Sequence, residues 1–234
     1  MKTFTKKLLA LGLTAIMATG FATACTAKES ETSADISGES QVAMLGGWQV
    51  VDDPVISDDA MDAFNLAMAT ITGVDYAPYA LLATQVVSGT NYCFLCQATV
   101  VSPDTKPTCK LVYVYKDTAG NAQILNIADV ELPGYTEETV TGGWAYAETP
   151  VVTDKVESVV DSAVANMLGA EYEAVALIGT QVVAGTNYAV LCQITSVTEN
   201  PVTTYEIVYI YENLDGECQI TSSEALDIAG LSQA

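Results

Sequence analysis

The side chains that could perform chemistry in this sequence are carboxylates, phenols and thiols. The sequence contains no histidine, so the residue that most often serves as a general base and as a transition-metal ligand is missing. Cys93 and Cys96 form a Cys-x-x-Cys pair, but residues at i and i+3 of a strand point to opposite faces. That pair therefore predicts neither a zinc site nor a redox centre. We expect a protein that is not an enzyme and that needs no cofactor and no metal.

The charge balance of the chain is strongly acidic. There are 8 Lys and Arg residues against 29 Asp and Glu residues, which gives a net charge of −21. A nucleic-acid-binding protein needs a cationic face that displaces counterions from phosphates, so nucleic acid is excluded as a partner. Strong acidity instead favours solubility and attraction to basic partners. Solvation of the surface alone explains most of these acids.

One stretch of eight residues occurs twice and is the most distinctive feature of the sequence. Residues 85–92 read Gln-Val-Val-Ser-Gly-Thr-Asn-Tyr, and residues 181–188 differ from them only by alanine in place of serine. Each copy predicts two strands joined by a tight turn, with the glycine at a positive φ angle. Two adjacent valines are unusual at a turn, because turns favour polar residues. The turn is either buried against a neighbouring domain or left exposed to fit the groove of a partner.

These octapeptides resemble the central signature of the cystatins, which inhibit papain-like cysteine proteases. A pair of glycines near the start of each copy, Gly46-Gly47 and Gly142-Gly143, matches a second cystatin feature. The resemblance covers nearly the whole chain outside the leader and the linkers. It implies an α+β fold with two cystatin-like domains, each one helix wrapped by a curved antiparallel sheet of four to five strands. It also implies reversible, tight-binding inhibition by occlusion of the active-site cleft.

In the cystatins a wedge of three elements fills the protease cleft, namely the glycine-containing trunk and two hairpin loops. The second loop departs from the family here, since residues 117–120 and 213–216 lack the Pro-Trp of secreted animal cystatins and offer no aromatic anchor. The resemblance gives the following protease-binding residues: Gly46, Gly47, Gln85, Val86, Val87, Ser88 and Gly89 in the first copy, and Gly142, Gly143, Gln181, Val182, Val183, Ala184 and Gly185 in the second.

A second interpretation is a non-inhibitory module with a cystatin-like fold, used at the cell surface for binding or as a structural part. In that case the glutamine, glycine and tyrosine of the signature serve turn geometry alone. A purely structural hairpin has no need of Val87 or Val183 at its end. The apolar tip therefore favours the inhibitor.

The duplication predicts two domains, because each copy is long enough to bury its own core. We expect repeat one at 44–130, a linker at 131–141 and repeat two at 142–234. Residues 1–25 read as an export leader with an apolar run too short to span a bilayer. The leader ends in a sequence that resembles the lipobox of bacterial lipoproteins, which implies an exported protein anchored to the cell membrane through a lipid on Cys25. Simple secretion after Ala24 is the alternative, and residues 26–43 predict a disordered tether.

Apolar periodicity predicts one helix in each repeat. The first follows an N-cap at Ser57 and extends to Ile71, and the second follows Thr153 and extends to Leu168. Alternation predicts that Tyr92, Phe94 and Cys96 cover the first helix. The expected strands are 79–86, 90–101, 109–116 and 122–127 in repeat one, and 175–182, 186–197, 203–211 and 218–222 in repeat two.

Two cysteines occur in repeat one alone. Cys93 and Cys109 correspond to Ala189 and Tyr205 in repeat two, and alternation places both on the outer face of neighbouring strands. An exported protein permits disulfides, so we expect a bridge between these two thiols, with reduced surface thiols as the alternative. Cys96, on the other face, is expected to be a small buried hydrophobe, as is its counterpart Cys192.

Overall fold

The computed structural model describes residues 46–103, 105–136, 138 and 140–232. The predicted leader and tether, and with them the predicted lipidation site Cys25, lie outside the described residues. The described residues all belong to one compact unit. None of the helices in these ranges has the length and apolar character that spanning a bilayer requires.

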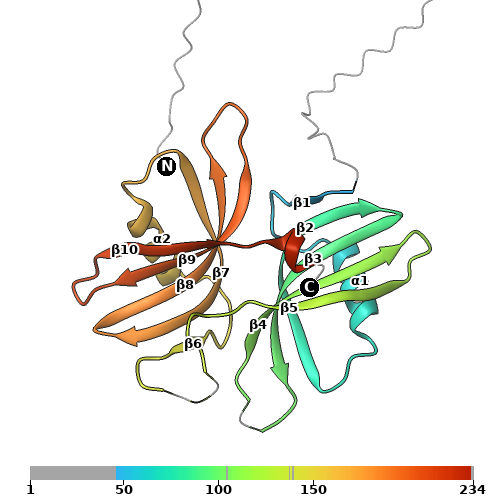
Figure 1. Ribbon diagram of the computed structural model, residues 1–234, viewed down its shortest axis with the longest axis horizontal. Coiled ribbons are helices and arrows are strands. Elements are labelled where there is room, and N and C mark those ends of the chain that lie inside the picture. Colours follow the sequence, from blue (N-terminus) through green and yellow to red (C-terminus); the bar gives the residue numbers. More distant parts are fainter. Residues whose placement is uncertain (1–45, 104, 137, 139, 233–234) are drawn as a thin grey trace, which may run out of the picture. The chain divides into compact units, whose positions relative to one another are not determined.

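Each repeat forms one five-stranded antiparallel sheet (Figure 1). The strands follow one another across the sheet in chain order, from β1 to β5 in repeat one and from β6 to β10 in repeat two. The elements of repeat one are β1 (Trp48–Val50), α1 (Asp58–Met68), β2 (Val74–Val87), β3 (Gly89–Val100), β4 (Thr108–Asp117) and β5 (Ala122–Asp129). Those of repeat two are β6 (Trp144–Tyr146), α2 (Asp154–Val164), β7 (Ala170–Val183), β8 (Gly185–Ser196), β9 (Thr203–Glu212), β10 (Cys218–Ala225) and α3 (Ile228–Leu231).

The two predicted helices begin where expected and end early. The hydroxyl of Ser57 accepts a hydrogen bond from the backbone N–H of Ala60 at 3.3 Å, which confirms the predicted N-cap, and Thr153 caps α2 in the same way. The helices end at Met68 and Val164, and the strands β2 and β7 begin a few residues later. Leu168, predicted to lie on the apolar stripe of α2, is outside the helix and 98% exposed.

The predicted α+β class is wrong. Within the described residues the chain forms two five-stranded antiparallel sheets and three short helices, so it is mostly β and does not have one helix per domain. Each of the two longer helices has 11 residues, whereas β2 and β7 have 14 residues each. The third helix, α3, follows the last strand of repeat two, where no helix was expected from the sequence.

One face of the first sheet packs against α1, and one face of the second sheet packs against α2. In repeat one, Phe64 of α1 lies edge-on to Phe94 of β3, with ring centroids 5.2 Å apart. Tyr92 and Cys96 belong to the same buried cluster, which confirms the predicted helix-covering face of β3. In repeat two, Val159 of α2 and its neighbours form the matching cluster.

The opposite faces of the two sheets share one hydrophobic core. Leu82, Leu95 and Tyr113 of repeat one belong to the same buried cluster as Ile178 and Leu191 of repeat two. Alternation along the strands produces both arrangements, since Phe94 points to α1 and Leu95 points to the shared core. The two repeats are therefore held together by burial of apolar surface as well as by the covalent chain.

The segment that follows the last strand of each repeat packs on the other repeat. Leu132, just after β5, lies so close to Gly179 of β7 that a Cβ there would overlap with it. Ile228 of α3 joins the shared core, and its carbonyl accepts a hydrogen bond from the Tyr113 hydroxyl at 2.9 Å. The predicted linker 131–141 thus contributes a core residue, because Leu132 is only 4% exposed.

The predicted disulfide between Cys93 and Cys109 is not formed. Both thiols are free and buried. The register explains why, since Cys93 pairs with Tyr113 and Cys109 pairs with Gln97, four positions apart along the ladder. The face that alternation marks as outer is the face that the other repeat covers, and burial raises the pKa of both thiols to about 12. Cys96 and Cys192 are buried, as predicted.

Candidate functional site

The tip of each first hairpin carries exposed valines. Val87 pairs with Gly89 across the β2–β3 turn, which leaves Ser88 alone at the end of the hairpin. The four valines of the two tips are between 42% and 70% exposed. The interpretation that buries these turns against a neighbouring domain is therefore wrong, and the apolar tips face solvent in both repeats.

The glycine of each tip is required by two separate constraints. Gly89 and Gly185 have φ angles of 137° and 124°, which confirms the predicted positive φ. In addition, a Cβ at Gly89 would overlap with the carbonyl of Lys116 and lie 2.8 Å from the ring of Tyr115. The strand β4 thus approaches the turn more closely than any side chain at residue 89 permits.

The glutamine and asparagine that both octapeptides share tie the hairpin to the trunk. Gln85 donates from Nε2 to the carbonyl of Gly46 at 2.8 Å and accepts from Asn91 Nδ2 at 2.6 Å. Repeat two has the same two hydrogen bonds, with the same lengths, between Gln181, Gly142 and Asn187. Gln85 and Gln181 therefore fix the position of the glycine trunk beside the hairpin. The sequence shows the asparagine in both copies, but its role becomes visible only with the fold.

A tyrosine on the next strand holds the tip from the other side. The hydroxyl of Tyr115 donates to the carbonyl of Ser88 at 2.7 Å, and that of Tyr211 donates to the carbonyl of Ala184 at 2.5 Å. Sequence reasoning missed these two tyrosines, although both stand at the same place in the two copies. Because each tip is bonded on both sides, little conformational entropy would be lost if a partner bound there.

The second hairpin turn lies next to the first. Gly89, at the start of β3, pairs with Asp117, at the end of β4, so the β4–β5 turn follows directly. Asp117 accepts hydrogen bonds within this turn from the side chain and backbone of Asn121 and from the backbone of Ala119. These bonds, those of Asn121 first, hold the pKa of Asp117 below its ordinary value.

All the protease-binding residues predicted from the resemblance therefore gather at one end of each sheet. We call these ends edge one and edge two. Edge one consists of the trunk at 46–47, the first tip at 85–89 and the second turn at 117–121. Edge two consists of the trunk at 142–143, the first tip at 181–185 and the second turn at 213–217.

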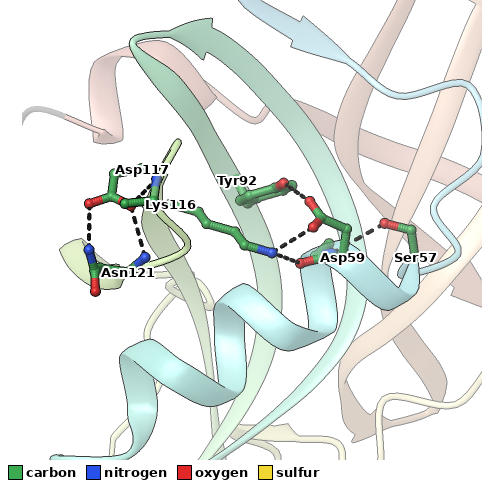
Figure 2. A network of polar contacts seen from close by, with 8 residues as sticks. Ser57, Asp59, Tyr92, Lys116, Asp117 and Asn121 are labelled. Atoms are coloured by element: carbon green, nitrogen blue, oxygen red, sulfur yellow. Dashed lines mark hydrogen bonds and ion pairs between the residues drawn. The ribbon is translucent and has the colours of Figure 1, made fainter.

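An ion-pair network ties the end of β4, next to the second turn, to the start of α1 (Figure 2). Lys116 donates from Nζ to Asp59 of α1 at 2.5 Å, and Tyr92 of β3 donates to the other oxygen of the same carboxylate at 2.5 Å. Repeat two keeps the pair with the charges reversed: Lys155 lies on α2, Glu212 lies on β9, and Tyr188 donates to Glu212. In each repeat the tyrosine bonds to the carboxylate, whichever element carries it.

The reversed pair gives a direct test of the network. Lys116→Glu is expected to lower Tm by a few degrees, because it places a second carboxylate opposite Asp59 at pH 7. Adding Asp59→Lys should recover most of this loss, because the double variant has the arrangement of repeat two. Thermal denaturation followed by circular dichroism measures both effects. A double variant no more stable than Lys116→Glu would contradict the interpretation.

The loss of Tm caused by Lys116→Glu must disappear at acid pH. The pKa of Asp59 is lowered chiefly by Lys116 and then by Tyr92, and that of Glu212 chiefly by Lys155 and then by Tyr188. A lowered folded pKa stabilises the fold above the pKa of the unfolded carboxyl, and this contribution is lost as the pH falls through the folded value. The difference in Tm between wild type and Lys116→Glu should therefore shrink steadily as the pH is lowered from 7 towards the acid range.

The edges offer shape and apolar surface. Within the described ranges no group of three or more Asp, Glu, Cys or His side chains is arranged to hold a metal ion. Carboxylates near the turns, such as Asp117, are engaged in local hydrogen bonds. What this arrangement can do chemically is to present a rigid apolar projection to a complementary groove.

Comparison with known proteins identifies no family. A scan against protein-family models finds no match to this chain, and a search of curated proteins finds no significant match. The resemblance to the cystatins rests on the motif residues and on their placement at the two edges.

Proposed function

We propose that this protein is a reversible, tight-binding inhibitor of papain-like cysteine proteases that occludes the active-site cleft with the trunk glycines and the first hairpin tip. The observation that carries the proposal is the exposed pair of valines at a tip bonded on both sides, present twice in one chain. An apolar pair kept in solvent at a rigid turn serves binding rather than folding.

The geometry of each edge agrees with the wedge that the resemblance implies. The trunk carbonyl of Gly46 is bonded to Gln85, and the second turn adjoins Gly89 through Asp117. The three elements thus lie side by side in the order trunk, first tip, second turn. Because hydrogen bonds hold all three, binding would require little ordering of the inhibitor, which favours affinity.

Inhibition of papain by the full chain tests the proposal. The wild-type chain should inhibit papain reversibly at or below micromolar concentration and leave trypsin and pepsin unaffected. The double variant Val87→Asp with Val183→Asp should lose at least about 100-fold in affinity, because each tip would bury an unpaired carboxylate in the cleft. Both side chains are exposed, so the fold should be retained.

The control makes the same substitutions at the other end of the sheets. Val101 and Val197 follow β3 and β8 at the ends far from the tips, and both are exposed. Val101→Asp with Val197→Asp should leave inhibition unchanged. A wild-type chain that leaves papain and related proteases fully active would favour the non-inhibitory surface module instead.

A further inference from the structure

The second turns of the two edges have the same backbone conformation. In edge one, Asp117 Oδ1 accepts from the backbone N–H groups of Ala119 and Asn121, both at 2.8 Å. In edge two, Asn213 Oδ1 accepts from the corresponding N–H groups of Asp215 and Glu217 at 3.0 and 2.9 Å. The backbone bond from Gly120 to Asp117 likewise returns as the bond from Gly216 to Asn213, at 3.1 Å in each turn.

The side chain after the first residue of this turn differs between the edges. Edge one has Thr118 and edge two has Leu214, which is 84% exposed. A leucine at this position adds nothing to the hydrogen bonds of the turn, because threonine occupies the same place in the same turn. The leucine therefore changes what the edge presents to solvent and leaves the backbone as it is.

The first valine of the tip is also more exposed at edge two than at edge one. Val182 is 70% exposed, whereas its counterpart Val86 is 46% exposed. The trunk of edge two begins with a tight turn in which Gly143 donates to the carbonyl of Val140 at 2.9 Å, and Val140 is itself exposed. A Cβ at Gly142 would lie 3.8 Å from the carbonyl of Val182, so this turn adjoins the first tip.

We propose that edge two is the principal docking surface for the protease cleft and that Leu214 determines its higher affinity. The proposal rests on the proposed function and names which of the two sites carries it. A leucine side chain transferred from water into an apolar subsite strengthens binding by about 10- to 100-fold. Edge one, with threonine at the same place, binds the same cleft more weakly.

Exchange of the two side chains in the full chain tests this inference with papain as the probe. Leu214→Thr gives edge two the turn of edge one and should raise the inhibition constant by at least about tenfold. Adding Thr118→Leu to that variant should recover most of the loss, because the leucine then stands in the same turn at edge one. Rescue by a residue in the other repeat is an effect that a structural role of Leu214 would not produce.

Leu168→Thr is the matched control. Leu168 is exposed like Leu214 but precedes β7 at the end of the sheet far from the tips, so its replacement should leave the inhibition constant unchanged. An inhibition constant of Leu214→Thr within twofold of wild type, with papain still inhibited, would overturn this inference and leave the proposed function standing. A wild-type chain that does not inhibit papain would overturn both.

Discussion

Gly89→Val and Gly185→Val are expected to destabilise the protein more than any other single change at the edges. Each variant is strained in two ways, because a β-branched residue disfavours a positive φ and because its Cβ overlaps with the next strand. The two effects together should lower the free energy of unfolding by about 3–5 kcal/mol. Urea denaturation followed by circular dichroism measures the loss.

A third glycine separates the two effects. Gly120 has a φ angle of 90°, but a Cβ there would meet no atom within 4 Å. Gly120→Val should therefore show the backbone strain alone, about 1–3 kcal/mol. Equal losses for Gly89→Val and Gly120→Val would show that the close approach of β4, at Lys116 and Tyr115, contributes nothing.

Leu132→Ala is expected to destabilise both repeats together. Removing a buried leucine costs about 2–5 kcal/mol, and Leu132 belongs to the core that the two sheets share. The chain has 2 tryptophans, Trp48 in β1 and Trp144 in β6, so single-tryptophan variants place one fluorescent reporter in each sheet. The urea midpoints of the two signals should coincide in the parent and move together in Leu132→Ala.

A displaced midpoint in one signal alone would show that the repeats unfold independently. Leu168→Ala serves as the control, because its exposed side chain makes no contribution to the core. Its midpoint should equal that of the parent for both tryptophans. The two variants thus show whether the stability of each sheet depends on the packing of the other.

Local features of the fold could be predicted from the sequence because they depend on nearby residues. The caps at Ser57 and Thr153 follow from side-chain chemistry, and the positive φ of Gly89 follows from the turn. The ends of the helices could not be predicted, because Met167 and Leu168 continue an apolar pattern that the chain does not bury. Periodicity alone does not show where a helix gives way to the next strand.

The contact between the two sheets could have been predicted from uninterrupted apolar runs in the strands. The alternation of side chains along β3 pointed instead to one buried and one exposed face. Residues 92–96 of β3 and 111–114 of β4 are apolar without interruption, which is typical of strands buried on both faces. Assigning Cys93 and Cys109 to an outer face led directly to the incorrect disulfide. At the candidate site, the motif marks the tips, but Tyr115 and Tyr211 belong to other strands and are placed there only by strand pairing.

The packing of α3 on repeat one means that repeat one cannot bury all of its apolar surface until the C-terminal end of the chain has been synthesised. Tyr113 and Ile228 are separated by 115 residues, and a ribosome adds about 5–20 residues per second. Ile228 is therefore made roughly 6–23 s after Tyr113, and until then α3 cannot cover its part of the apolar face of the first sheet. During that interval a nascent chain whose first sheet has formed exposes the part of that face on which Ile228 packs. Folding that begins only after the whole chain has been made, or a chaperone bound to that face, would keep newly made molecules from associating with each other.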